Sequence, residues 1–236
     1  MSKNRIWELD AFRGVCIIGM VMIHFVFDLV SLFGLVAWEY NSVFVFVMNW
    51  GGILFLLISG TCATLGTHSV RRGLIVFGCG LLVTAVTVGM YLLGIAHPII
   101  IIYFGALHCL GVCMMLWYFF KKLPTWVLGV LGGIMVLLGF WCKTLRVEYP
   151  YLIWLGLTTP TFATSDYFPL LPYLGFFLLG AVIGRVLYRD KKTLLPRVNP
   201  RAPLIRFCTA CGRHSLIIYL VHQPVISLII LLLAKV

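Results

Sequence analysis

Long apolar runs follow one another along almost the whole of this chain. A helix that crosses a lipid bilayer needs about 20 mainly apolar residues, because its backbone groups must be hydrogen-bonded inside the hydrocarbon. The alternating pattern of a membrane β-barrel is absent from these runs. The sequence therefore predicts an all-α membrane protein, a polytopic helical bundle with about seven transmembrane helices, at Gly14–Phe33, Val43–Leu65, Leu74–Gly94, Ile99–Phe120, Trp126–Cys142, Leu170–Leu187 and Ser215–Leu233.

The remaining segments are short. Tyr151–Leu157 is apolar but too short to span, so we interpret it as a re-entrant or interfacial element. Tyr188–Arg213 is basic and contains three prolines, and we interpret it as a cytosolic connector. The glycines Gly180 and Gly184 predict a close contact between helices. No change of composition marks a second domain, so we expect residues 1–236 to form a single integral-membrane domain.

Basic residues favour one side of the membrane. With seven spans and a cytosolic N-terminus, fifteen of the 18 Lys and Arg residues fall inside, and Lys143, Arg146 and Lys235 fall outside. The positive-inside rule then places the C-terminus outside. We expect a bacterial inner membrane, with a homodimer among the assemblies that the sequence leaves open. The fifteen are Lys3, Arg5, Arg13, Arg71, Arg72, Lys121, Lys122, Arg185, Arg189, Lys191, Lys192, Arg197, Arg201, Arg206 and Arg213.

The net charge of +11 and the eight cysteines do not indicate nucleic-acid or metal binding. Membrane topology and contact with the lipid bilayer account for the charge. Cys208 and Cys211, followed by His214, resemble half of a zinc site, but no second pair stands near them. We therefore expect neither a nucleic-acid partner nor a metal.

The first predicted span places two ionisable side chains, His24 and Asp28, where a membrane helix is normally apolar. An Asp at mid-helix costs about 2.5–3.5 kcal/mol on insertion scales, so such residues usually face the inside of a bundle. Their i, i+4 spacing puts them on one face, where the carboxylate could orient the imidazole as a general base. Arg13 lies on the same stripe, about 16 Å away along the axis, at the cytosolic interface. This stripe suits a long ligand with an anionic head and a reactive far end.

Two acids, Glu8 and Asp10, come just before this stripe. Acidic residues stabilise the N-terminal end of a helix, and Asp is a favoured N-cap residue. We expect Asp10 to be the N-cap of the first helix. Its i, i+3 spacing from Arg13 also allows an ion pair.

Other polar residues fall near the middle of predicted spans. For His108 and His222, a helix-to-helix hydrogen bond competes with a functional role. Tyr219 stands i, i+3 from His222 on the last span, next to Gln223. We expect Pro224 to kink or open that helix and free a backbone carbonyl.

Arg13, ten intervening residues and His24 match the Arg-x10-His signature of the transmembrane acyltransferase superfamily, which is best known from the acyltransferase-3 family. The whole chain resembles more closely a sister family, the heparan-α-glucosaminide N-acetyltransferase-like proteins. The segments that carry this resemblance extend in order over nearly the whole length. They are ELDAFRG (Glu8–Gly14), LISGTCATLG (Leu57–Gly66), FGALHCLGV (Phe104–Val112), DYFPLLPYLGFFLLG (Asp166–Gly180) and GRHSLIIYLVHQPV (Gly212–Val225).

The resemblance implies a membrane-embedded acyltransferase. Such an enzyme takes an acyl group from cytosolic acyl-CoA, usually acetyl-CoA, and delivers it to a sugar hydroxyl or amine on the far side of the membrane. It implies that Arg13 holds the CoA phosphates and that His24 is the catalytic histidine, acting either as a base for direct attack or as an acyl carrier.

Further residues are assigned around these two. The candidate catalytic residues are His24, Asp28, His108 and His222, with a ring N–H available to stabilise the thioester oxyanion. The candidate CoA-binding residues are Arg13, Arg206, Arg213 and Asp10. The candidate residues for the glycan or amino-sugar acceptor are Asp166, Tyr167, Tyr219 and Gln223. Tyr167 and Phe168 equally fit an interfacial aromatic belt.

Two other function classes remain open. A proton- or ion-coupled transporter also uses intramembrane His and Asp, but transporters often contain broken helices in two matching halves. This chain has one predicted broken helix and no matching partner. A non-catalytic membrane scaffold is the third class. Turnover of labelled acetyl-CoA by the purified protein separates an enzyme from both.

Overall fold

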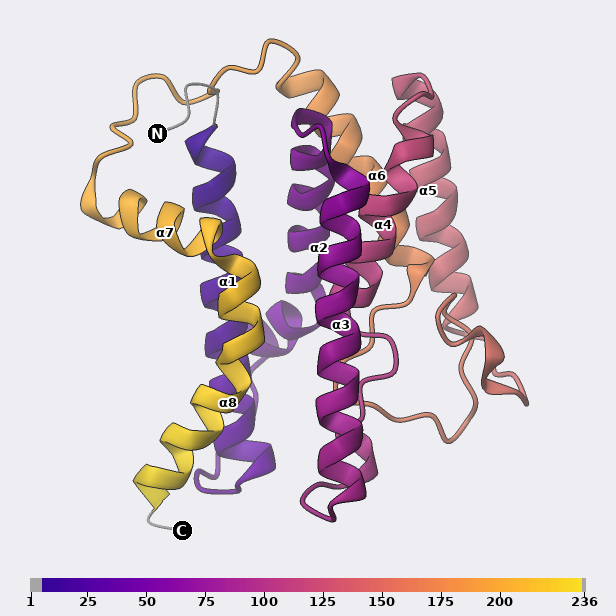
Figure 1. The fold of residues 1–236 in the computed structure, drawn as a ribbon, viewed down its shortest axis with the longest axis vertical. Helices are drawn as coiled ribbons and strands as arrows, with labels where there is room; N and C mark the ends of the chain where they lie inside the picture. Colours follow the sequence, from indigo (N-terminus) through magenta and orange to yellow (C-terminus); the bar gives the residue numbers. More distant parts are fainter. Residues whose placement is uncertain (1–5, 235–236) are drawn as a thin grey trace. The chain divides into compact units, whose positions relative to one another are not determined.

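The structure is a computed structural model that describes residues 6–234, and the regular elements in this part of the chain are helical (Figure 1). Lys3, Arg5 and Lys235, which contribute to the charge argument, lie outside the described residues. Two isolated β-bridges also occur among these residues, one between Phe104 and Tyr167 and one between Arg146 and Thr158. The α-helices are α1 (Trp7–Phe27), α2 (Ser42–Leu65), α3 (Ser69–Leu92), α4 (Ala106–Phe120), α5 (Thr125–Cys142), α6 (Leu170–Leu187), α7 (Pro203–Arg213) and α8 (Ser215–Ala234).

Six of these helices are long and apolar enough to cross a membrane, counted over residues 6–234. They are α1 with its extension to Leu32, α2, α3, α5, α6 and α8. The prediction of an all-α, multi-pass membrane protein is confirmed, with six long apolar helices and one shorter apolar helix, α4, at the seven predicted positions.

The fourth predicted span, Ile99–Phe120, is wrong over its first third. The helix α4 begins only at Ala106 and contains 15 residues, about 22 Å at the rise of an α-helix, against a hydrocarbon core of about 30 Å. Pro98 begins the short 3-10 turn η2 (Pro98–Ile100), and the backbone then stays non-helical up to Gly105. Hydroxyl groups bond to carbonyls of this stretch, which removes the need for helix hydrogen bonds there. They belong to Thr84, Thr164 and Ser165.

By packing, the described chain divides into two compact units, residues 6–55 with 190–234, and residues 56–189. In the first unit, α7 crosses α1, and α8 then runs beside α1 in the same chain direction (Figure 1). An added Cβ at Gly14 would lie less than 3.0 Å from the Cys208 carbonyl oxygen, and one at Gly212 equally close to that of Asp10. Glycine at both positions therefore allows the backbones of α1 and α7 to touch.

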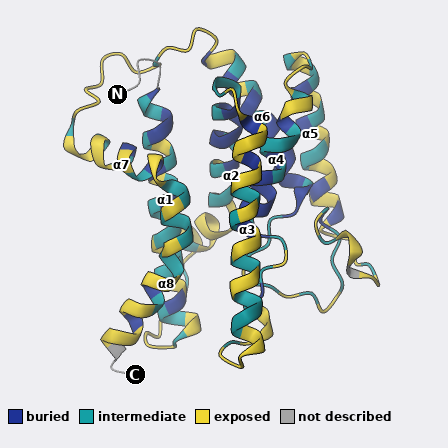
Figure 2. Cartoon of the chain, viewed as in Figure 1, coloured by how far each residue is buried: buried dark blue, intermediate teal, exposed yellow. Residues whose placement is uncertain are grey.

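In the second unit, α3 packs along α4 and α5 packs along α6. The later part of α2 lies against α6, where Thr61 Oγ1 donates a hydrogen bond of 2.8 Å to the Gly180 carbonyl. Added Cβ atoms at Gly180 and Gly184 would collide with backbone atoms of α2, which confirms the close contact predicted from these glycines. Side chains such as Phe177 and Leu178 are fully buried, and α6 is the most enclosed helix (Figure 2).

The structure agrees with the prediction for one of the two segments outside the predicted spans and differs for the other. Tyr151–Leu157 contains part of one 3-10 turn, η3 (Pro150–Leu152), and no long helix, as expected of a piece too short to span. Tyr188–Arg213 is not only a connector, because it ends in helix α7. Pro203 stands in the first turn of that helix, where its missing N–H leaves no hydrogen bond unmade.

We predict that Gly14→Ala destabilises the first unit, because the new methyl group must displace the α7 backbone at Cys208. Overpacking of this kind costs about 1–3 kcal/mol. Thermal unfolding of the purified protein in detergent should show a melting temperature several degrees below that of the wild type.

Gly19→Ala is the matched control on the same helix. Nothing lies within 4 Å of a Cβ added there, and Ala is the better helix former, so this variant should melt at or slightly above the wild-type temperature. Equal melting temperatures for the two variants would show that the crossing of α1 and α7 is not tight.

Candidate active site

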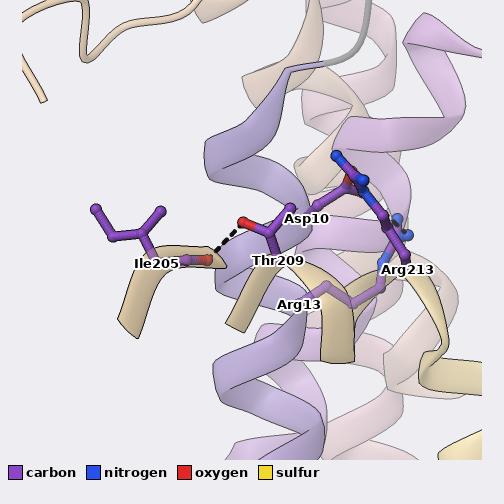
Figure 3. Close-up of polar contacts among 5 residues, drawn as sticks. All are labelled: Asp10, Arg13, Ile205, Thr209 and Arg213. Atoms are coloured by element: carbon purple, nitrogen blue, oxygen red, sulfur yellow. Dashed lines mark hydrogen bonds and ion pairs between the residues drawn. The ribbon is translucent and has the colours of Figure 1, made fainter. Parts of the chain in front are cut away.

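Two arginines share one buried carboxylate near the N-terminal end of α1 (Figure 3). An Asp10 carboxylate oxygen lies 3.5 Å from Nε of Arg213, at the end of α7, and the other lies 4.0 Å from an Nη of Arg13. Asp10 is 4% exposed, whereas the side chains of Arg13 and Arg213 keep 20% and 33% of their surface accessible. The carboxylate thus holds two guanidinium groups in place, and the trio carries a net positive charge.

The expected N-cap role of Asp10 is wrong. The helix begins at Trp7 with Ile6 as its N-cap, so Asp10 is already inside the helix and its side chain faces α7. The predicted i, i+3 pairing with Arg13 is confirmed. The pairing with Arg213, 203 residues away, could not be found from local spacing, although both residues belong to the predicted CoA-binding set.

Further hydrogen bonds lie within α7 and between α1 and the chain that precedes α7. Thr209 is buried on the inner face of α7, and its hydroxyl donates to the Ile205 carbonyl at 2.7 Å (Figure 3). The Glu8 carboxylate accepts hydrogen bonds from the Thr193 hydroxyl at 2.8 Å and from the Leu194 backbone N–H at 2.7 Å. The chain that leads to α7 is therefore tied to the first turn of α1.

His24 and His222 meet further along the same pair of helices, α1 and α8. Their ring centroids lie 4.9 Å apart, with the planes at 61°. Nδ1 of His222 is 2.5 Å from the Tyr219 carbonyl oxygen, and since a carbonyl only accepts, this nitrogen carries a proton and Nε2 is the acceptor of the neutral ring. No residue that the structure describes forms a hydrogen bond with either ring nitrogen of His24.

Asp28 lies one turn beyond His24 and is 2% exposed. Its carboxylate accepts a hydrogen bond of 2.7 Å from Nε2 of Gln223 on α8, so it is not the partner of His24 that the i, i+4 spacing led us to expect. The Asp28 backbone N–H still bonds to the His24 carbonyl, so the two residues keep their helical spacing, and it is the side chain that turns to Gln223 on α8. The π turn η1 (Asp28–Leu32) begins at this residue. Turns of this kind are rare and often lie at functional sites.

The last helix does not break where we expected. Pro224 lies inside α8, which continues from Ser215 to Ala234. Proline removes one backbone hydrogen bond, and membrane helices tolerate this because neighbouring groups satisfy the backbone. The side chains of Tyr219 and Gln223 therefore stay in helical register with His222, and the Tyr219 ring centroid is 5.4 Å from that of His222.

His108 belongs to the second unit, and both of its ring nitrogens are in use. Nδ1 accepts from the Gly105 backbone N–H at 3.3 Å, and Nε2 lies 3.3 Å from the Thr84 hydroxyl. Because that hydroxyl gives its hydrogen to the Ile102 carbonyl at 2.6 Å, the imidazole donates through Nε2. This geometry favours the alternative of a helix-to-helix bond over a catalytic role.

The two predicted sugar-binding residues before α6 also hold the second unit together. The Asp166 carboxylate accepts a hydrogen bond of 3.0 Å from the Ala106 backbone N–H and so caps α4. The Tyr167 hydroxyl donates to the Ile153 carbonyl at 2.6 Å. Burial raises the pKa of the Tyr167 phenol, which therefore remains a protonated donor. A role of either residue in acceptor binding stays a prediction.

Arg206 stands apart from the other predicted CoA-binding residues. It is exposed on α7 and lines a surface hollow with Arg201, whereas Arg13 and Arg213 meet at Asp10. The sequence could not separate Arg206 from Arg213, because α7 was not predicted and the face of α7 on which each arginine lies was therefore unknown.

The first unit thus carries two kinds of chemistry along α1. A pair of held guanidinium groups at its start suits phosphate, which binds arginine through charge-assisted hydrogen bonds. An imidazole with unbonded nitrogens, about 16 Å further along the helix, suits transfer of a proton or of an acyl group. A molecule that reached both would carry phosphate at one end and its reacting group at the other.

The chain was compared with known families. The chain matches the family model described as "Heparan-alpha-glucosaminide N-acetyltransferase, catalytic" over residues 5–224. The matched range covers the second unit and most of the first, and it includes the arginine and histidine pairs described above. No curated protein and no solved structure matches the chain.

We predict that Gln223→Leu destabilises the protein, because the buried carboxylate of Asp28 loses the amide that bonds it. A buried polar group left without its partner costs about 1–3 kcal/mol, and more when it is charged. Thermal unfolding in detergent should therefore show a clear fall in the melting temperature.

The double variant Asp28→Leu with Gln223→Leu tests the reason, since it removes the carboxylate together with its donor. It should regain part of the loss, as expected for two groups that interact directly. A Gln223→Leu protein that melts like the wild type would show that this hydrogen bond does not support the fold.

Proposed function

Because the chain belongs to the heparan-alpha-glucosaminide N-acetyltransferase catalytic family, we propose that it carries an acetyl group from cytosolic acetyl-CoA to an amine or hydroxyl of a sugar on the far side of the membrane. Family membership and the six apolar helices make it a membrane-embedded acetyltransferase. The observation that carries the finer proposal is the placement of Arg13 and His24 on one helix. Arg13 is held beside Arg213 there, and His24 lies beside His222.

The direction of the helices supports a cytosolic CoA site. Asp10 near the start of α1 contacts Arg213, two residues before α8, and Asp28 near the end of α1 contacts Gln223 on α8, so the two helices run parallel. Since both are candidate spans, their first residues face the same side. By the positive-inside rule, the basic residues near these ends support a cytosolic location for that side, which is where CoA is found.

The CoA end of the site is electrostatic. Arg13 and Arg213 hold the phosphates of CoA, and charge-assisted hydrogen bonds of this type contribute about 1.5–3 kcal/mol each. The Asp10 carboxylate would repel phosphate, so its part is to fix the two guanidinium groups, which it contacts at 3.5 and 4.0 Å. Asp10 is therefore a positioning residue.

The reacting end uses His24. As the acceptor nitrogen or oxygen attacks the thioester carbonyl carbon, His24 takes its proton. The new C–N or C–O bond forms, the C–S bond breaks, and the CoA thiolate leaves and is protonated. In the acyl-carrier route, a His24 nitrogen attacks the thioester first and then passes the acetyl group to the acceptor. Both routes need a ring nitrogen that no protein group occupies, and His222 lies against the ring to orient it.

We predict that His24→Ala lowers the rate of acetyl transfer by about 10²–10⁴, the range of general-base catalysis. CoA binding should be nearly unchanged, because His24 lies about 16 Å from Arg13 along the helix. The measurement is transfer of labelled acetyl from acetyl-CoA to glucosamine, together with calorimetric titration by CoA.

His214→Ala is the control, because His214 is exposed at the turn before α8 and lies outside the site. It should retain wild-type turnover. Undiminished transfer by His24→Ala would exclude both the base and the carrier role. Absence of any acetyl-CoA turnover by the wild type, with movement of a solute into sealed vesicles, would favour the transporter alternative.

We predict that Arg13→Ala weakens CoA binding by about tenfold or more, because one of the two held guanidinium groups is lost. The CoA affinity should also depend less on salt concentration, because less electrostatic attraction remains for salt to screen. Calorimetric titration with CoA at low and at high NaCl measures both quantities.

Arg197→Ala removes the same charge from an exposed position in the chain before α7 and serves as the control for net charge. If Arg13→Ala and Arg197→Ala change the CoA affinity to the same extent, Arg13 contributes only general charge and its assigned role is wrong.

A further inference from the structure

Helix α7 has an outer face that the first unit leaves uncovered. Its inner face packs on α1 through Thr209 and Gly212, which are buried. On the outer face, Leu204 is 73% and Phe207 is 58% exposed, and Arg206 is also exposed. Leu204 and Phe207 stand i, i+3 and so lie on one side of the helix, and Arg206 lines the same surface hollow as Phe207.

The charge around this face is of one sign. After Asp190 the sequence contains no further acidic residue, while Lys191, Lys192, Arg197 and Arg201 all precede α7. A polypeptide with this charge run is attracted to an anionic surface, each basic residue near such a surface contributing a roughly similar increment.

A shaped hollow lies on the same face. It is formed by the residues Arg201, Pro203, Arg206, Phe207 and Ala210. Its lining thus combines two guanidinium groups with an aromatic ring and two small apolar residues. Arginine is well suited to phosphate because its fork-like donors match phosphate oxygens.

The orientation of α7 fits a helix in the plane of the membrane surface. Figure 1 shows α7 crossing α1, which is a candidate span and so runs through the bilayer. The crossing is fixed by the glycine contacts of Gly14 and Gly212. An amphipathic helix that lies across a spanning helix presents its outer apolar residues to the boundary between headgroups and acyl chains.

From these four observations we propose that the outer face of α7 is a binding site for anionic phospholipid. The phosphodiester group lies in the hollow between Arg201 and Arg206, and Leu204 and Phe207 contact the upper part of the acyl chains. The site is distinct from the arginine pair at Asp10, and the proposal holds whether or not the proposed acetyl transfer is correct.

The test uses the purified full-length protein in detergent, titrated with short-chain phosphatidylglycerol or phosphatidylcholine and followed by native mass spectrometry. We expect phosphatidylglycerol to bind in preference to phosphatidylcholine. The double variant R201Q/R206Q should lower the phosphatidylglycerol affinity by roughly thirtyfold, the effect of two basic residues at an anionic surface. R201K/R206K, which keeps both charges, should retain most of the affinity.

K192Q/R197Q is the matched control, since it removes two exposed charges outside the hollow, and it should change the affinity far less than R201Q/R206Q. Melting temperatures of all variants report whether each is folded. Equal binding of the two lipids by the wild type would overturn the proposal, as would equal effects of the two double variants. Loss of bound phosphatidylglycerol on addition of CoA would assign the hollow to the nucleotide instead and would also overturn it.

Discussion

The hydrocarbon around these helices offers no hydrogen-bonding partner, and the structure depends on polar side chains that find one inside the protein. Asp28 is 2% exposed and is bonded by Gln223 from a helix nearly two hundred residues later. His108 is bonded through both nitrogens, by groups on different elements. Apolar side chains are alike on every helix and cannot specify neighbours, so these few polar pairs help to determine which helices meet.

Glycine residues determine how closely the backbones of neighbouring helices approach. Where α1 meets α7 and where α2 meets α6, the backbones touch at glycines, and an added Cβ would collide with a carbonyl group. Such contacts permit the arginine at the end of α7 to reach Asp10 on α1. The pairing of Arg13 and Arg213 at Asp10 therefore depends on the close backbone contact at Gly14 and Gly212, which lies within two helical turns of it. Membrane helices commonly use small residues in this way, since lipid gives no hydrophobic drive for helices to associate.

The sequence predicted the spans because hydropathy is a local property, and it failed where the deciding contact is distant. Ile99–Gly105 is as apolar as the helix that follows, but hydroxyl groups of Thr84, Thr164 and Ser165 bond to its carbonyls. Helix α7 was hidden by three prolines that indicated a loop, although Pro203 is a normal first-turn residue. Asp10 had the composition of an N-cap, and only the fold shows its partner on α7.

The candidate site shows the same division. The spacing from Arg13 and Asp28 set His24 apart from His108 and His222 in the sequence, and the fold separates all three by their hydrogen bonds. His108 uses both nitrogens, and His222 donates one to the Tyr219 carbonyl. Neither nitrogen of His24 is hydrogen-bonded by any residue between 6 and 234. A general base or an acyl carrier needs an available lone pair, so a histidine without a structural bond, on the same helix as a held cation, is the one that the chemistry can use.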